Sequence, residues 1–336
     1  MLQLFQSIFG SSHEDTPYPD ELIKRGVERA VDGTDPRLRA LPGYQKKLRT
    51  AVTHALGHVV DLVDSLPASL ELNHAGYITN PELLAYFASA THAQEILTLD
   101  PELNQWRGSA DGAAPHIVML LLMELQERNV FGMALEGDMV RRDVAQTTVN
   151  FAQHRLTDPA TTEEDTRRLL KRRAFDHLLT LALGRIASAH TERAGLERER
   201  TLLRRKCAAL EAGNWGFGGE QAAAPPNPQT LQQQQEEIES QLKALGAGAG
   251  LLSAHLDITV DVLTQAEHNF WIARSPLIIN RMHVKQTQAS AQAPEISLTV
   301  LHNAAGRSLV ARLVAIAREE LPAQRDFLRE TERYLV

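Results

Sequence analysis

The sequence predicts a mainly helical α+β fold in which a long antiparallel helical hairpin is inserted between the strands of a small antiparallel sheet. Two stretches, 163–211 and 231–271, carry apolar residues at alternating steps of three and four, which is the spacing of a coiled-coil seam. Residues 144–151 alternate polar and apolar side chains, as a half-buried strand does. Further strand-like segments follow the helical stretches, so the hairpin separates two parts of one predicted sheet.

The two apolar seams match each other as an antiparallel pair. Facing positions such as Leu203 with Ile238, or Leu179 with Leu263, keep a nearly constant index sum. Residues 163–211 hold twelve Lys and Arg against eight Asp and Glu, whereas residues 231–271 hold one against six. These opposite net charges favour pairing of the two segments with each other over pairing of either with itself.

Two glycine-containing segments interrupt the predicted hairpin. Residues 213–228 cannot continue a helix, and Trp215 and Phe217 lie there either as an exposed contact point or folded back on the helix ends. The glycines of 246–250 leave two alternatives open. They break or kink the second helix, or they admit the stem of Arg193 from the facing arm.

The helical region before the hairpin, residues 21–128, contains several sequence patterns that are typical of the first turn of a helix. We expect helices over 21–31 and 43–66, and two more opening at Asn80-Pro81 and Asp100-Pro101, where a capping side chain precedes a first-turn proline. Residues 115–127 are apolar nearly all round and predict a central helix. A capping box at Thr161 and Glu164 begins the hairpin.

The sheet is expected from several short segments. Residues 130–135 and 144–151 predict a β-hairpin with its turn at 136–143, and residues 276–285 and 295–302 predict two later strands. Residues 308–317 fit a strand or a helix, and a final helix starts at 321. The resulting division of the chain has four parts: a flexible tail with a short amphipathic tip (1–20), a helical region (21–128), the sheet with a C-terminal helix (129–160 and 272–336), and the coiled-coil hairpin (161–271, with a flexible tip at 212–229).

Composition narrows the class of protein. The chain has 336 residues, is 43% hydrophobic and 23% charged, and carries a formal net charge of −7. That charge gives no global attraction to nucleic acid. A single cysteine, Cys207, excludes an intrachain disulfide, and its place on the seam predicts a small core residue. With no signal-peptide pattern at the N-terminus, we expect a cytoplasmic location.

One pattern has the spacing of a metal site. His54, His58 and Asp61 share one face of the helix predicted over 43–66, and imidazoles four residues apart can hold one divalent metal ion. The glutamate that follows the first histidine in zinc proteases is absent, since Ala55 is there. The alternative is an ordinary solvated face opposite the apolar stripe. No other cofactor is indicated.

The leading functional hypothesis is a non-enzymatic protein-interaction or scaffold protein that uses the coiled-coil arm and an unidentified protein partner. It follows from the lack of a convincing catalytic constellation in the sequence. One alternative is a metal-binding protein or metal-dependent enzyme using His54, His58 and Asp61. Another is a peripheral membrane adaptor, in which Leu2, Phe5 and Phe9 form a contact face, although that segment has no Lys or Arg to favour an anionic surface.

Overall fold

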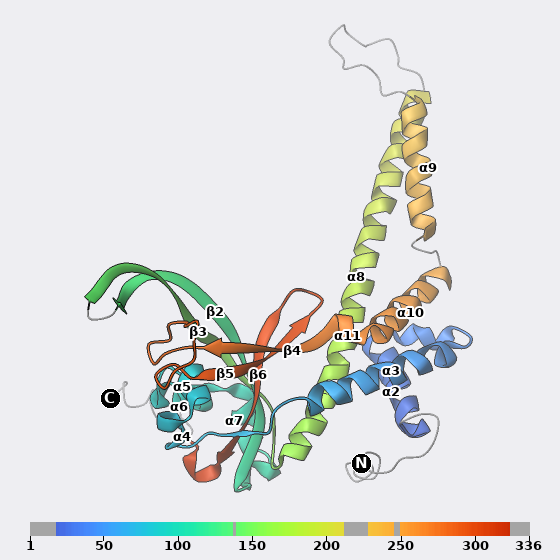
Figure 1. The fold of residues 1–336 in the computed structure, drawn as a ribbon. Helices are drawn as coiled ribbons and strands as arrows, with labels where there is room; N and C mark the ends of the chain where they lie inside the picture. The colour runs from blue at the N-terminus through green and yellow to red at the C-terminus, as the bar shows by residue number, and fades with distance from the viewer. Residues whose placement is uncertain (1–17, 137–138, 212–227, 245–248, 323–336) are drawn as a thin grey trace, which may run out of the picture. The chain divides into compact units, whose positions relative to one another are not determined.

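The chain has an α+β fold that divides into two compact units. The computed structural model describes residues 18–136, 139–211, 228–244 and 249–322 (Figure 1). The first unit combines Met1–Gly57 with Phe175–Ala266, and the second combines His58–Ala174 with Glu267–Val336. Helices α3 (Tyr44–Asp64) and α8 (Glu163–Glu211) contribute residues to both units.

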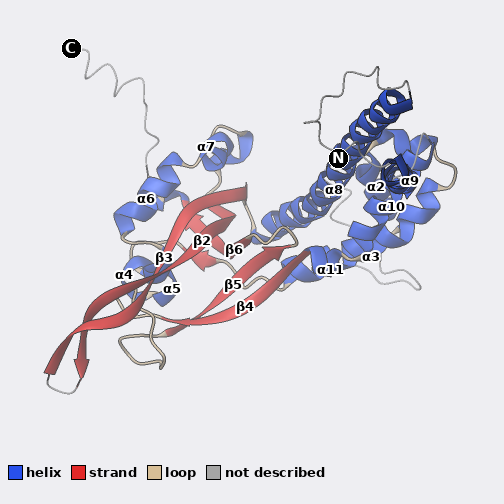
Figure 2. Cartoon of the chain, turned by 90° about the horizontal axis from the view of Figure 1, so that it is seen from above, coloured by secondary structure: helices blue, strands red, loops and turns tan. Residues whose placement is uncertain are grey.

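The second unit is built on one sheet (Figure 2). Its strand order is β3-β2-β6-β5-β4; these neighbours pair antiparallel, and the short β1 pairs parallel with β6. The strands are β1 (Leu70–Glu71), β2 (His116–Glu136), β3 (Met139–Ala160), β4 (Phe270–Ile278), β5 (Glu295–Asn303) and β6 (Ser308–Ala317). Helices α8 to α11 lie between β3 and β4 in the sequence. The predicted single sheet, interrupted in sequence by a helical insertion, is therefore confirmed.

The predicted helix over 115–127 is wrong, because this segment is the first half of β2. It pairs with β6 on one side and β3 on the other, and both of its faces are covered: Met119 and Leu121 belong to one buried cluster and Leu120 to another. A strand buried on both faces has a continuous apolar run, which periodicity cannot distinguish from a buried helix.

Four short helices pack against the larger of these clusters. They are α4 (Gly76–Thr79), α5 (Pro81–Tyr86), α6 (Ala90–Leu99) and α7 (Pro101–Arg107), with one-turn 3₁₀ segments at Ala110–Ala113 and Arg318–Glu320. The predicted caps are confirmed: the Asn80 side chain accepts from the amides of Glu82 and Leu83, and Asp100 accepts from Leu103. Asp100 also accepts from the Leu156 amide of β3, 2.9 Å away, so this cap ties α7 to the sheet.

The first unit is helical. It holds α2 (Asp20–Gly33), a 3₁₀ segment η1 (Pro36–Ala40), the first part of α3, most of α8, α9 (Pro228–Ala244) and α10 (Ala249–Thr264). The helices predicted over 21–31 and 43–66 are thus confirmed. Helix α8 is capped by Thr162, whose hydroxyl accepts from the Asp165 amide, one residue beyond the predicted capping box.

The predicted second arm ends earlier than expected and is divided. It consists of α9, α10 and the short α11 (Ala266–Asn269), while residues 270 and 271 already belong to β4. Gly250 lies inside α10, and 245–248 lie outside the described residues, as do the tips at 1–9 and 212–227 and the predicted final helix beyond 322. The ambiguous segment 308–317 is a strand.

The predicted hairpin of the sheet is confirmed but is much longer than expected. Its strands are β2 and β3, with 21 and 22 residues, instead of 130–135 and 144–151. The strand predicted over 276–285 is displaced to Phe270–Ile278, and the one predicted over 295–302 is β5. The Gly306 amide donates to the Asn303 carbonyl across the β5–β6 turn.

Candidate interaction surfaces

The histidines of the predicted metal face lie on α3, as expected. The Nε2–H of His58 donates to the carbonyl oxygen of Phe270 at 2.6 Å. That bond fixes the proton on Nε2, so only Nδ1 of this ring is left to bind a metal ion. His54 and Asp61 are exposed. Within the described ranges, no group of three His, Cys, Asp or Glu side chains is placed to hold a metal ion. The metal site therefore remains a sequence-based prediction.

The predicted partner-contact residues fall on segments that the structure does not describe. Leu2, Phe5 and Phe9 lie within 1–17, and Trp215 and Phe217 lie within 212–227. Their roles stay predictions. In the described part of the chain, no helix is long and apolar enough to cross a bilayer.

The most exposed apolar side chains of the sheet lie on the β2–β3 ribbon, defined here as residues 124–136 of β2 and 139–148 of β3. Strand β6 pairs with β2 only as far as Met123, so beyond that residue β3 is the one strand of the described chain that pairs with β2. The two strands run out past the rest of the sheet in both views (Figures 1 and 2). The ribbon therefore presents a free backbone edge along β2.

Among the side chains that the structure describes near the end of this ribbon, three large apolar ones are exposed. Phe131 is 80% exposed, Met133 is 67% exposed and Val130 is 38% exposed. Val130 and Phe131 are adjacent on a strand and so point to opposite faces. Both faces of the ribbon therefore carry an exposed apolar side chain at residues 130 and 131. Groups of exposed apolar side chains often mark contact sites in soluble proteins.

Side-chain hydrogen bonds hold the two strands of the ribbon in register. The Gln146 amide donates to the Met133 carbonyl at 3.1 Å, and the Thr147 hydroxyl donates to the Asn129 side chain at 3.0 Å. Gly132 makes room for the first of these, because a Cβ built there would lie 2.2 Å from Oε1 of Gln146. These bonds hold the backbone that carries Phe131 and Met133 in one register with β3.

The base of the ribbon is fastened to the loop after β4. The amide of Val149 donates to the His283 carbonyl and the amide of Lys285 donates to the Thr147 carbonyl, both at 2.8 Å. The Lys285 ammonium also lies 2.7 Å from the Glu127 carboxylate. The ribbon is therefore held at its base and free beyond it.

Helices α8 and α9 form the second projecting pair (Figure 1). Leu203 of α8 and Leu231, Ile238 and Leu242 of α9 make one buried cluster, and Leu196 and Cys207 pack against it. The predicted facing pair of Leu203 and Ile238 thus belongs to one cluster. Arg204 and Glu239 add an ion pair at 3.2 Å, as the opposite charges of the two segments favour. Unlike the exposed apolar residues of the ribbon, the apolar residues of this cluster are buried.

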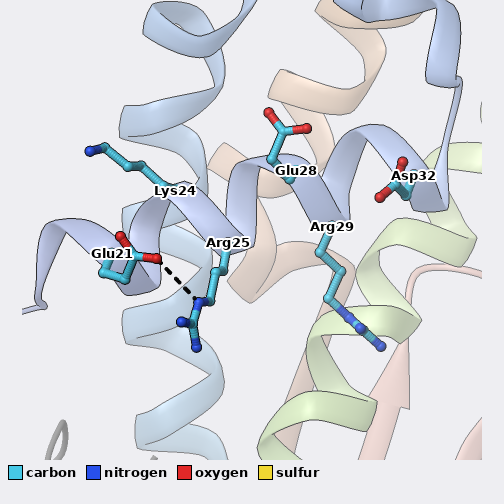
Figure 3. A pocket seen from close by; sticks show the side chains of 6 residues that line it. All are labelled: Glu21, Lys24, Arg25, Glu28, Arg29 and Asp32. Carbon is cyan, nitrogen blue, oxygen red and sulfur yellow. Dashed lines mark ion pairs between the residues drawn. The ribbon is translucent and has the colours of Figure 1, made fainter. Parts of the chain in front are cut away.

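Helix α2 presents a shallow hollow lined only by charged side chains: Glu21, Lys24, Arg25, Glu28, Arg29 and Asp32 (Figure 3). Most of these charges are already engaged. Arg29 forms a two-point ion pair with Asp176 of α8, and Arg39 bridges Glu28 and Asp32. Glu21 and Arg25 pair along the helix at 3.5 Å. This hollow is a solvated, internally neutralised surface.

A buried acid–base pair joins α10 to the α2–α3 connection. The ring of His255, 1% exposed, donates from Nδ1 to the Asp35 carboxylate at 2.8 Å. Asp35 also accepts from the backbone and guanidinium of Arg37. The Arg37 guanidinium, and after it the His255 ring, hold the pKa of Asp35 well below its usual range despite the opposing effect of burial. The geometry makes this pair an anchor for α10.

Sequence reasoning missed the ribbon as a surface. The sequence predicts a strand for the segment that contains Val130, Phe131 and Met133, but the exposure of this segment depends on where β6 begins, 170 or more positions later in the chain. The available signal was two adjacent apolar residues followed by Gly132 at the distal end of a predicted hairpin.

The chain matches no protein-family model, no curated protein and no solved structure.

Proposed function

We propose that this protein is a non-enzymatic interaction protein that binds a protein partner through the β2–β3 ribbon. The observation that carries the proposal is the exposure of Phe131 on a ribbon pre-ordered by cross-strand hydrogen bonds. The partner adds an extended segment to the free edge of β2 and supplies an apolar cleft for Phe131. Main-chain hydrogen bonds then give affinity, and the aromatic anchor gives specificity.

The charge of the ribbon supports a protein partner over a polyanion. Residues 124–136 and 139–148 hold four Asp and Glu against three Arg and no Lys, which leaves no excess of positive charge for nucleic acid or an anionic membrane. An apolar anchor with balanced charges around it suits a protein interface, whose core is depleted in charge.

The helical pair has a supporting role in this proposal. We propose that α8 and α9 pack as an antiparallel coiled coil that sets a second contact region apart from the first unit's other helices. At 1.5 Å per residue, the 49 residues of α8 extend about 74 Å. The shared cluster and the Arg204–Glu239 pair support this arrangement. Contact with a partner then involves the outer face of α8, where Leu202 is 53% exposed.

Site-specific photocrosslinking in the cells that make the protein tests the ribbon. The photoreactive residue p-benzoylphenylalanine replaces Phe131 in one variant and Ile78 of α4, which is 66% exposed, in the control. We expect a discrete protein adduct from position 131 and none from position 78. Equal labelling from both positions, or no adduct from position 131, would contradict the proposal. An adduct of twice the chain's mass would identify a second copy as the partner.

A further inference from the structure

A cavity of about 740 Å³ opens in the second unit where β6 begins and β2 loses it as a partner. Its volume falls within the range of small-molecule sites. The residues that matter here are Glu124 of β2, Gln153 and Arg155 of β3, Arg307 of the β5–β6 turn, and Ser308 of β6. They come from three separate stretches of the chain, which only the folded sheet brings together.

Three charged side chains that line this cavity are unpaired. The side chains of Glu124, Arg155 and Arg307 have no hydrogen-bond or ion-pair partner anywhere in the portion of the chain that the structure describes. Two other arginines of the same unit show the contrast: Arg167 donates to three backbone carbonyls and to Glu163, and Arg312 donates to Glu82 and to the Ala68 carbonyl. Two free guanidinium groups in one cavity leave their planar donor forks available to an anion.

The wall formed by β3 is shaped by a bulge. Leu122 pairs with Arg155 but Glu124 pairs with Ala152, so β3 has one extra residue here. Gln153 adopts a left-handed conformation with φ of 53°. The neighbouring His154 is fixed, because its Nε2–H donates to the Tyr86 carbonyl at 2.7 Å and its ring stacks on Phe87. Strained backbone and bulges are enriched beside functional sites, where they redirect side chains.

The hydroxyl on the β6 wall is also held in place. Oγ of Ser308 lies 2.8 Å from Nδ1 of His302, its cross-strand neighbour on β5, and is hydrogen-bonded to it. The His302 ring stacks on Trp271 of β4, with ring centroids 5.4 Å apart. The cavity therefore offers a positioned hydroxyl beside the two arginines and one carboxylate.

We propose that this cavity binds a small hydroxylated organic anion, with its phosphate or carboxylate group between Arg155 and Arg307. Glu124 accepts a hydrogen bond from a ligand hydroxyl, and Ser308 adds a second polar contact. The carboxylate of Glu124 disfavours a ligand that is anionic at every position, since like charges in one cavity repel. This binding activity is separate from the protein-interaction role of the ribbon.

Isothermal titration calorimetry on the full chain tests the site with three probes. Glucose 6-phosphate presents a phosphate and hydroxyls, gluconate presents a carboxylate and hydroxyls, and glucose presents hydroxyls alone. We expect at least one of the two anions to bind and glucose not to bind. The anion that binds more tightly identifies which acidic group the site takes. Failure of both anions to bind, or equal binding of glucose, would overturn the proposal.

Variants locate the binding. Arg155→Ala and Arg307→Ala are each expected to weaken binding of the anion at least tenfold, and Arg155→Lys to weaken it less than Arg155→Ala. The control is Arg281→Ala, which removes the same charge from an exposed turn outside the cavity. Because Arg155 and Arg307 are exposed, these changes leave the thermal midpoint of unfolding unchanged. An equal loss of affinity in Arg281→Ala would show nonspecific charge attraction and overturn the assignment.

Discussion

The α8–α9 helical pair and the β2–β3 ribbon are both made of two segments, but they bury their apolar side chains differently. In the helical pair, Leu203, Leu231, Ile238 and Leu242 are each at most 6% exposed. In the ribbon, Phe131 and Met133 are at least 67% exposed. The helical pair lies in the first unit and the ribbon in the second, so each has to be stabilised by contacts within its own unit.

The difference follows from how the two structures satisfy their backbones. A helix makes its hydrogen bonds internally, so a helical pair needs only an apolar seam to be complete. A two-stranded ribbon leaves the outer edge of each strand unpaired and is marginal alone. The apolar cluster between α8 and α9 is buried and contributes to folding, whereas Phe131 and Met133 of the ribbon are exposed.

The largest effect is expected from breaking the helical seam. Leu203→Ala removes a side chain from the buried cluster shared with α9 and should lower the free energy of unfolding by about 3 kcal/mol. The matched control is the adjacent residue: Leu202→Ala, at a site 53% exposed, should change it by less than about 0.5 kcal/mol. Urea unfolding followed by circular dichroism measures both. Equal costs would mean that α9 does not cover Leu203.

The opposite pattern is expected for the ribbon. Phe131→Ser combined with Met133→Ser should leave the free energy of unfolding within about 0.5 kcal/mol of the original value, because both side chains are exposed. Affinity for the crosslinked partner should fall by about 2 kcal/mol, roughly 30-fold, as for an aromatic anchor. Surface plasmon resonance with the identified partner measures this loss. A stable variant with unaltered affinity would remove the ribbon from the interface.

Replacing one glycine in each of the two regions should change stability by a smaller amount, with opposite signs in the ribbon and in α8. Gly132→Ala should destabilise the ribbon by about 1 kcal/mol, since its Cβ displaces Gln146 from the Met133 carbonyl. Gly184→Ala in α8 should instead stabilise by about 0.5–1 kcal/mol, because open space surrounds the new Cβ and alanine favours a helix. Thermal unfolding of the two variants distinguishes the signs. If Gly132→Ala were stabilising, the hydrogen bond from Gln146 to the Met133 carbonyl would contribute nothing to stability.

The smallest expected effect is a dependence of the unfolding free energy on pH, to which a buried histidine in each of the two units contributes. Burial lowers the pKa of His154, beside the ribbon's base, and of His177 in α8 below the ordinary value of 6.5. Between the lowered value and 6.5, the unfolded chain binds protons that the folded chain does not. Stability therefore rises with pH through this window and falls on acidification. His154→Gln should flatten the slope of unfolding free energy against pH below 6.5, and an unchanged slope would contradict this assignment.

Local signals in the sequence predicted local structure well. The caps at Asn80 and Asp100 depend on a side chain and the amides two or three positions later, and both are present. The helical insertion within one sheet followed from changes in apolar period along the chain. Cys207 is half-buried and packs against the α8–α9 cluster, as its seam position predicted.

Features that depend on distant partners could not be predicted in this way. The sequence predicts a helix over 115–127 because the strands that pair with both edges of β2, and the two apolar clusters that cover its faces, are not visible in its own pattern. The cavity requires Glu124, Arg155 and Arg307 together, and no spacing rule links positions so far apart. The ribbon's exposure likewise depends on where its neighbour β6 begins.

The bulges of β3 have a consequence for how its sequence can change. Three register shifts in the β2–β3 pairing each add a residue to β3, and Asp143, Gln153 and Asp158 have positive φ at these places. Phe151 and Leu156 lie five positions apart, an odd number, yet both point into the same core. Without the extra residue at Gln153, strict alternation would turn one of them toward the opposite face. Deleting one residue here would therefore turn the side chains on one side of the deletion to the opposite face of β3. Polar side chains of that part of the strand would then face the core, and its apolar side chains would face away from it.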